Sequence, residues 1–228
     1  DYDDEAWDTL LDQLSVDEMT GMLNDCAYNT GAVESISKPE TSEPDGPAGF
    51  TSLTGPTGNC AYCSEFIMAQ TWNVELMERM GEMVGQEALA SGYNGWYAPA
   101  FNTHRSPFAG RNFEYYSEDP LVSGAMAAQV VAGSKEAGTY CFVKHLVANG
   151  QDTYRDSLYE WMSEQALREV YLPAFRMLVR SGATGIMTSY NRLGATWAGG
   201  NAGLLTDVLR GEWGFAGCVI TDYADHHA

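Results

Sequence analysis

Short apolar segments that alternate with helical segments constrain this chain more than any other feature of its sequence. Apolar runs at 140–143, 185–188 and 218–221 each have the length of a buried strand, and helical periodicity fills the stretches between them. Strands that are separated by helices form βαβ units, in which the strands lie parallel in one sheet. The sequence therefore predicts an α/β fold, with helices at 4–24, 73–91, 120–136, 161–180 and 202–212.

Two of these helices carry explicit boundary signals. Ser15 and Glu18 have the spacing of a capping box, which predicts that a helical turn begins after Ser15. Asn73 is a favourable N-cap for the helix at 73–91, and Gly92 is a favourable stop. The predicted core face of that helix consists of Leu76, Met77, Met80, Val84 and Ala88.

Polar and charged residues follow three of the strands at the point where each strand ends. Lys144 and His145 follow the first apolar run, Tyr190 follows the second and Asp222 follows the third. In a (β/α) barrel, the C-terminal ends of the strands form the rim on which active sites are built. We therefore expect a TIM-like (β/α)8 barrel that is incomplete at its C-terminal end, because the chain stops soon after the third run.

The charge balance limits the partners that the chain can have. A net charge of −19 repels the phosphates of nucleic acids and of anionic membranes. No apolar run approaches the roughly 18 residues that a spanning helix needs. We expect a neutral substrate, and neither nucleic acid nor membrane as a partner.

The cysteines give little support to a metal or redox site. Cys60 and Cys63 have CxxC spacing, but no second pair follows, so a loop pair or a local disulfide is favoured over zinc or redox chemistry. Cys141 and Cys218 lie in apolar runs and are predicted to be small core residues. The odd count of 5 favours a reducing compartment such as the cytoplasm over secretion. We expect no metal and no cofactor.

Asp222 is the strongest candidate for a catalytic group. A carboxylate at a barrel rim can attack an anomeric carbon only while it is ionised. We expect Lys144 and Arg111 to supply cations that keep the pKa of Asp222 low. The alternative is that Asp222 caps the following turn.

Four further residues could contact a polyhydroxylated substrate. Asp45 lies in a tight Pro-Gly loop from which a carboxylate can accept two hydroxyls, although an ordinary Asp-Gly turn is the alternative. Arg111 can orient a substrate or hold a neighbouring acid. Lys144 and His145 can together donate several hydrogen bonds to a polyol. Arg155 and Asp156, in the next loop, could belong to the same wall or pair with each other.

Five segments resemble, in the same order, the conserved blocks of glycoside hydrolase family 3. They are Asp45-Gly-Pro-Ala-Gly, Gly110-Arg-Asn-Phe-Glu-Tyr-Tyr-Ser-Glu-Asp-Pro120, Lys144-His145, Met187-Thr-Ser-Tyr-Asn191, and the stretch 205–223 that ends in Ile220-Thr-Asp-Tyr223. The last is the most specific. The resemblance covers nearly the whole chain.

The resemblance implies a retaining, exo-acting β-glycosidase with a β-linked glycoside or oligosaccharide as substrate. Asp222 would be the nucleophile, and Asp45, Arg111, Lys144 and His145 would hold the hydroxyls of the terminal sugar. Tyr190 matches an aromatic residue beside the nucleophile, and Arg155 falls in a loop that often joins the same subsite. Tyr223 stands where the family usually has Trp.

The second carboxyl group of a retaining glycosidase is not identified in this sequence. In most of the family it is a Glu on a separate α/β-sandwich domain. We therefore expect residues 1–228 to form a single partial barrel domain that needs a complementary domain or chain.

Two other functions remain open at this point. The first is a non-catalytic carbohydrate-binding or assembly module. The second is the β-N-acetylglucosaminidase subgroup, which uses an Asp-His pair in the loop after the Lys-His strand. Asp156 and Ser157 match that motif, but Leu158 stands where its His would be.

Overall fold

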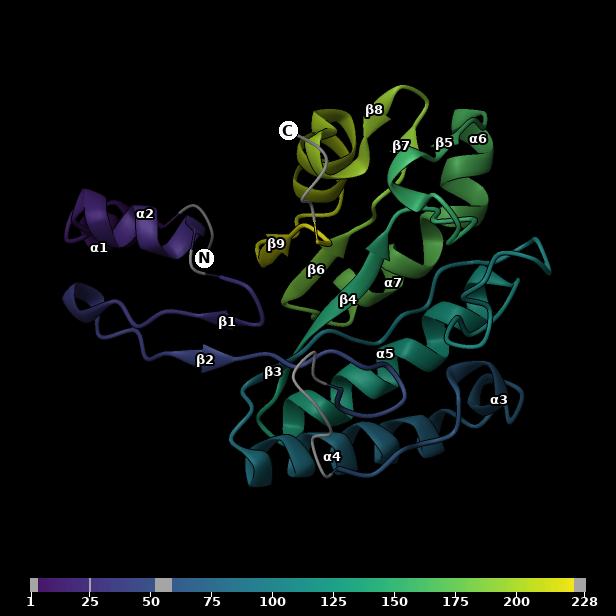
Figure 1. Cartoon of the computed structure of the whole chain (residues 1–228), viewed down its shortest axis with the longest axis horizontal. Coiled ribbons are helices and arrows are strands. Elements are labelled where there is room, and N and C mark those ends of the chain that lie inside the picture. Colours follow the sequence, from purple (N-terminus) through teal and green to yellow (C-terminus); the bar gives the residue numbers. More distant parts are fainter. Residues whose placement is uncertain (1–3, 25, 52–58, 224–228) are drawn as a thin grey trace.

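The computed structural model of the chain describes residues 4–24, 26–51 and 59–223. Its centre is a four-stranded parallel sheet in the order β3 (Gly95–Trp96), β4 (Tyr140–Leu146), β6 (Gly185–Thr188) and β9 (Cys218–Ile220) (Figure 1). Helices connect the successive strands. The predicted α/β fold with a parallel sheet is confirmed.

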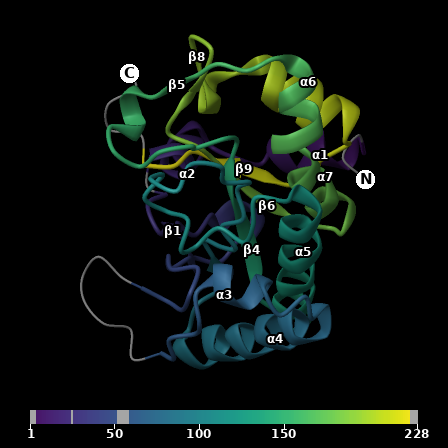
Figure 2. The same ribbon diagram turned by 90° about the vertical axis from the view of Figure 1, so that its right-hand side faces the viewer.

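Helices α4 (Val74–Ser91), α5 (Pro120–Glu136) and α7 (Pro173–Arg180) lie along the outside of this sheet (Figure 2). α4 and α5 approach closely because Gly81 and Gly133 stand at their contact. A Cβ on either glycine would collide with a backbone carbonyl of the other helix. Within the described residues, no helix combines the length and apolar character needed to span a bilayer.

The boundaries of α4 are those that the sequence predicts. The Asn73 side chain accepts a hydrogen bond from the Leu76 amide, and Gly92 ends the helix with a left-handed φ of 77°. Four of the five predicted core positions are buried. The prediction for Leu76 is wrong: it is 45% exposed, whereas the adjacent Met77 is fully buried.

The helix predicted at 161–180 is shorter and interrupted. It begins only at α6 (Glu164–Ala166), continues as a π-helical turn over Leu167–Tyr171, and resumes as α7. Pro173 has no amide hydrogen to donate, and the preceding turn widens so that the Leu172 amide bonds to the Leu167 carbonyl. Trp161 lies outside the helix and is exposed. The last helix, over Gly203–Glu212, is likewise π-helical.

The two faces of the sheet bury different sets of residues. The outer face packs Trp96, Cys141, Val143 and Ile186 against the helices in the main core. The inner face carries a smaller cluster formed by Tyr97, Phe142 and Met187, with Ile220 against it. Alternation along each strand therefore assigns every residue to the core side or to the barrel interior.

β9 is the edge strand of the sheet among the described residues. Consequently Cys218 is exposed, and its prediction as a core residue is wrong, whereas Cys141 in β4 is buried as predicted. Cys60 and Cys63 are both exposed free thiols in a loop. A separate three-stranded sheet combines β5 (Tyr159–Glu160), β7 (Arg192–Leu193) and β8 (Thr196–Trp197).

An N-terminal arm extends to one side of the barrel (Figure 1). It comprises α1 (Ala6–Leu11), α2 (Val16–Asn24) and a ladder of β1 (Asn29–Thr30) with β2 (Thr41–Ser42). The capping box is confirmed, because the Glu18 carboxylate accepts from the Ser15 amide and the Ser15 hydroxyl accepts from the Glu18 amide. Between α2 and β1, Tyr28 packs against Tyr97 of the barrel interior, with 5.5 Å between the ring centroids.

Burial of Glu65, at the start of α3 (Glu65–Ala69), reduces the stability of the fold. Its side chain is fully buried, and neither carboxyl oxygen has a hydrogen-bond partner among the described residues. Burial raises the pKa of Glu65 from 4.5 to about 8. The folded chain therefore keeps this proton at neutral pH, whereas the unfolded chain releases it.

We expect the free energy of unfolding to fall as the pH rises through the window from 4.5 to about 8. The slope that Glu65 contributes is about 1.4 kcal/mol per pH unit. Glu160, whose pKa burial raises to about 7, adds to the slope in the lower part of this window. A Glu65→Gln variant should lose the slope above neutrality and exceed the wild type in stability at the alkaline end. Urea unfolding at several pH values measures this, with the exposed Glu75→Gln as the control, and an unchanged slope would contradict it.

Candidate active site

The inner face of the sheet delivers two charged residues to one end of the barrel. Lys144 lies two residues after Phe142, and Asp222 lies two residues after Ile220, so both continue the inner alternation. β4 runs further than predicted, so that Lys144 and His145 belong to the strand itself rather than following it.

A bulge in β4 brings His145 to the same site as Lys144. Lys144 pairs with Met187 and Leu146 pairs with Thr188, which leaves His145 as an extra residue. Its amide donates to Oδ1 of Asn102, and its carbonyl accepts from Nδ2 of Asn102, both at 2.7 Å. The buried Asn102 side chain thus replaces the partner that the bulge removes.

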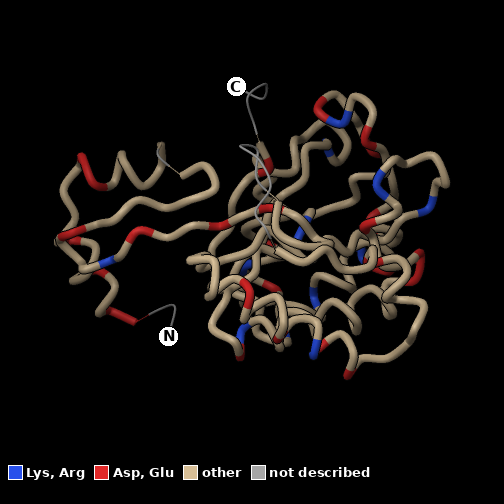
Figure 3. Tube along the Cα trace, turned by 60° about the horizontal axis from the view of Figure 1, so that its bottom comes forward, with Lys and Arg blue, Asp and Glu red and all other residues tan. Residues whose placement is uncertain are grey.

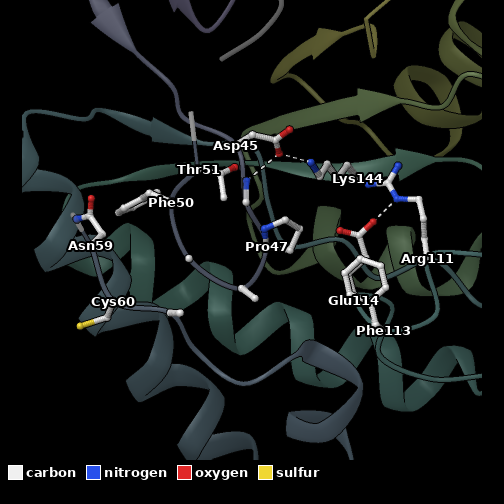
Figure 4. A pocket seen from close by; sticks show the side chains of 14 residues that line it. Asp45, Pro47, Phe50, Thr51, Asn59, Cys60, Arg111, Phe113, Glu114 and Lys144 are labelled. Atoms are coloured by element: carbon white, nitrogen blue, oxygen red, sulfur yellow. Dashed lines mark hydrogen bonds and ion pairs between the residues drawn. The ribbon is translucent and has the colours of Figure 1, made fainter. Parts of the chain in front are cut away.

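Asp45 and Lys144 form an ion pair at the barrel end (Figure 4). A parallel bridge to Tyr97 places the Asp45 loop beside β3. Asp45 Oδ1 accepts from Lys144 Nζ at 2.5 Å and from the Gly46 amide at 2.8 Å. Burial alone would raise the pKa of Asp45, but Lys144, the Gly46 amide and Arg111 together hold it below its usual value. Lys144 is 3% exposed and Asp45 38% exposed.

Arg111 is held by Glu114, three residues along the same loop, and both side chains are largely buried. These two residues line a pocket of about 370 Å³ together with Asp45, Lys144 and the loops at 46–51 and 59–61 (Figure 4). Asp222 and His145 are not part of this lining. The pocket therefore lies beside the Asp45 loop and adjoins the site through Asp45 and Lys144.

Asp222 follows β9, and its side chain is 18% exposed. Its Oδ1 accepts from the Tyr223 amide at 2.9 Å, and its Oδ2 lies 3.4 Å from Nε2 of His145. Burial raises the pKa of Asp222, and this effect exceeds the opposing effects of the Tyr223 amide and of the nearby cations.

The expectation that cations keep the pKa of Asp222 low is therefore wrong. Lys144, Arg155 and Arg111 do act on Asp222 in the lowering direction. Their direct ion-pair partners, however, are other acids: Asp45 for Lys144, Glu114 for Arg111 and Asp152 for Arg155. Each cation therefore lies closest to its own acid, and the combined effect of the three on the pKa of Asp222 is smaller than the effect of burial.

His145 is fully buried, and its pKa is well below the usual value because of that burial and because of Arg111, Lys144 and Arg155. It is a neutral imidazole at physiological pH, so its 3.4 Å contact with Asp222 is not an ion pair. Its other nitrogen, Nδ1, lies 3.2 Å from the hydroxyl of Tyr115. That hydroxyl also lies 2.6 Å from Nδ2 of Asn149.

Arg155 and Tyr190 contact each other and form another part of the site. The guanidinium carbon of Arg155 stands 4.2 Å from the centre of the Tyr190 ring, and Arg155 pairs with Asp152 at 3.1 Å. The alternative pairing with Asp156 is wrong, because the guanidinium contacts Asp152 instead, three residues earlier across a turn. Tyr223 follows Asp222 and is 55% exposed.

The structure thus brings Asp222, His145, Lys144, Asp45, Arg111, Arg155 and Tyr190 together, with Tyr223 at the rim. Sequence reasoning did not find Asn102, Tyr115 or Asn149, whose side chains support this set. Tyr115 lies inside the 110–120 segment, and Asn102 and Asn149 follow strand-like runs, which is the one signal that could have indicated them. No group of three or more potential metal ligands is found among residues 4–24, 26–51 and 59–223.

Residues 48–227 match the family model described as glycosyl hydrolase family 3 N-terminal domain. A β-glucosidase from Rhizobium radiobacter is 37% identical over 226 residues, which are 97% of this chain and 28% of the relative. β-Glucosidase B from Emericella nidulans is 36% identical over 95% of the chain and 26% of its own length. The chain therefore spans about a quarter of the length of these curated relatives.

Solved structures agree with these matches. β-Glucosidase 3B from Thermotoga neapolitana, in complex with glucose, superimposes with a TM-score of 0.87 at 37% identity, over 95% of this chain and 33% of that one. A β-glucosidase from Bifidobacterium adolescentis gives a TM-score of 0.89 at 35% identity, over 95% of this chain and 32% of that one.

Proposed function

The chain belongs to glycoside hydrolase family 3, and we propose that it supplies the nucleophile and the sugar-binding subsite of a retaining β-glucosidase. The observation that carries this proposal is the position of Asp222. Its carboxylate stands at the C-terminal end of a barrel strand, 3.4 Å from Nε2 of a neutral His145 and within the field of three cations. The substrate is a terminal β-linked glucosyl residue of a glycoside or oligosaccharide.

The reaction proceeds in two displacements at the anomeric carbon. An oxygen of Asp222 forms a bond to that carbon while the bond to the leaving oxygen breaks, and a general acid protonates the leaving oxygen. Water then attacks the same carbon and gives a proton to the conjugate base of that acid, and the ester bond to Asp222 breaks. The anomeric configuration is retained because each step inverts it.

The subsite residues hold the sugar for this attack. Asp45 has one carboxyl oxygen occupied by Lys144 and the Gly46 amide, which leaves the other free to accept hydroxyl protons. Lys144 donates to hydroxyl oxygens, as do the guanidinium groups of Arg111 and Arg155, and His145 lies in the same subsite with its Nε2 toward Asp222. Tyr190 and Tyr223 present aromatic surface beside the nucleophile.

The general acid is proposed to be a Glu on a complementary α/β-sandwich domain or chain, while residues 1–228 form a single barrel domain. The acids of the described site support this view. Asp45 is held in its ionised form by Lys144, and Glu114 accepts from the Arg111 guanidinium, so neither is a ready proton donor. Acidic residues are spread over both the arm and the barrel (Figure 3), which disfavours nucleic acid or an anionic membrane as a partner.

An activated fluoroglucoside tests the proposal in the purified chain. Its leaving group needs no acid assistance, and its ring fluorine slows the second displacement, so the sugar accumulates on the nucleophile. We expect one adduct by intact mass spectrometry, mapped to the peptide that contains Asp222. An Asp207→Asn variant, altered at an exposed acid, should label like the wild type.

Two outcomes would contradict the proposal. An adduct on a carboxylate other than Asp222 would assign the nucleophile elsewhere. Saturable glucose binding without any adduct would instead favour a non-catalytic carbohydrate-binding module.

A further inference from the structure

Three buried side chains form a continuous chain of contacts behind the nucleophile. Nδ2 of Asn149 lies 2.6 Å from the Tyr115 hydroxyl, which lies 3.2 Å from Nδ1 of His145. Nε2 of His145 lies 3.4 Å from Asp222 Oδ2. Tyr115, His145 and Asn149 are each less than 4% exposed, so water does not compete for these contacts.

The proton positions in this chain follow from its end at Asp222. An ionised carboxylate attracts an N–H and repels a nitrogen lone pair, so Nε2 of the neutral His145, 3.4 Å from Oδ2, must carry the imidazole proton. Nδ1 is then an acceptor, and the Tyr115 hydroxyl must donate to it. The Tyr115 oxygen in turn accepts from Asn149, whose amide nitrogen can only donate. One proton arrangement satisfies all three links.

Tyr115 is able to hold this arrangement permanently. Burial raises its pKa above the ordinary phenol value, so the hydroxyl keeps its proton at neutral pH. Its ring is fixed on both sides: it lies edge-on to His145, and the Arg111 guanidinium carbon stands 5.7 Å from its centre.

We propose that Tyr115 is a positioning residue that fixes the tautomer of His145, and so keeps an N–H directed at the nucleophile. This inference rests on the proposed function, because it concerns the same Asp222. An N–H of His145 directed at Oδ2 favours the ionised carboxylate. Without the Tyr115 hydroxyl, Nδ1 becomes a buried acceptor without a donor, and the ring loses its restraint.

The titratable and charged groups that face Asp222 and His145 come from several elements. They are Lys144, Arg111, Arg155, Tyr115, Tyr190 and Tyr28. Among the described residues, only Tyr115 is hydrogen-bonded to the His145 nitrogen remote from Asp222. Its removal therefore changes the His145 ring without removing any of the cations.

The test compares Tyr115→Phe with Tyr116→Phe. Tyr116 is the next residue, is equally buried, and its hydroxyl has no hydrogen-bond partner among the described residues, so it is a matched control. The first readout is nitrogen NMR of the chain labelled on its four histidines. In the wild type we expect His145 to show a protonated Nε2 and a hydrogen-bonded, unprotonated Nδ1. Tyr115→Phe should move the Nδ1 resonance toward that of an unbonded imidazole nitrogen, and Tyr116→Phe should not.

The second readout is the pH dependence of labelling by the activated fluoroglucoside. In Tyr115→Phe the carboxylate is harder to ionise, so the acidic limb of the rate profile should move to higher pH. Labelling on that limb should fall by roughly fivefold, which is the net worth of one hydrogen bond. Tyr116→Phe should follow the wild-type profile.

Failure of this inference differs from failure of the proposed function. If Asp222 labels but wild-type His145 carries its proton on Nδ1, or Tyr115→Phe matches Tyr116→Phe in both readouts, the positioning role is wrong. The wild-type NMR measurement decides the question even if Tyr115→Phe does not fold. If Asp222 never labels, the proposed function fails. The His145 tautomer measured by NMR still shows whether Tyr115 fixes the imidazole.

Discussion

An Asp222→Asn variant is expected to lose glycosyl labelling and at the same time to unfold at a higher temperature than the wild type. An amide nitrogen or oxygen cannot displace a leaving group as a carboxylate can, so the first displacement should slow by at least about a thousandfold. The amide oxygen can still accept from Nε2 of His145, which preserves the local geometry.

The gain in stability follows from the raised pKa of Asp222. Because the folded state binds this proton more tightly than the unfolded state, ionisation above the folded pKa costs stability. Asn removes that cost, so the variant should exceed the wild type at neutral pH. The advantage should vanish as the pH falls through the unfolded pKa of Asp, where both states are protonated.

Thermal unfolding at neutral and acidic pH, beside mass spectrometry of the fluoroglucoside adduct, measures both effects. The surface variant Asp207→Asn should show neither. A variant that is inactive but less stable than the wild type at neutral pH would mean that Asp222 is a structural residue.

Breaking the ion pair of Asp45 and Lys144 is expected to have the second largest effect. The loss of folding stability should depend on which of the two partners is replaced. Asp45→Asn leaves the Lys144 ammonium, which is 3% exposed, without its counter-charge. Loss of one partner of a buried pair costs about 3–5 kcal/mol, and the 38% exposure of Asp45 reduces this to about 2–3 kcal/mol. Lys144→Met leaves a carboxylate that water can reach, so it should cost less than about 1 kcal/mol.

The double variant separates stability from sugar binding. Asp45→Asn with Lys144→Met contains no buried unpaired charge, so its urea-unfolding free energy should return to within about 1 kcal/mol of the wild type. All three variants should nevertheless bind glucose at least about tenfold more weakly, because charged hydrogen bonds to its hydroxyls are lost. If the two single variants were equally stable, the pair would not be buried on the lysine side as described.

The sequence alone predicts the sheet and most of the site because both depend on local patterns. Apolar runs of strand length, followed by Lys144, Tyr190 or Asp222, place those residues at one end of a parallel sheet whatever the details of packing. The helix at 73–91 is predicted within a residue or two, because Asn73 and Gly92 each act on their own turn.

What the sequence does not predict depends on contacts between distant segments. Nothing near Asn102 indicates that its amide holds the backbone of His145, more than forty residues later. The pKa of Asp222 depends on which acids the cations pair with, and those pairs form only in the fold. Leu76 and Cys218 are apolar residues in regular elements, but both are exposed, and for Cys218 this depends on the position of β9 at the edge of the described sheet.

Because β4 contains one extra residue, His145, the site includes a break in the regular pairing of β4 with β6. Before the bulge, the odd-numbered Cys141 and Val143 face the helices, and after it the even-numbered Leu146 does. Deletion of the single codon for His145 would therefore return every remaining residue of β4 to one uninterrupted alternation, with each core side chain still in the core. Such a strand would be more regular than the present one, but it would lack the imidazole beside Asp222. Under the proposed function, loss of this one residue is therefore expected to impair the site while the barrel is kept, so the length of β4 is a feature to compare with activity.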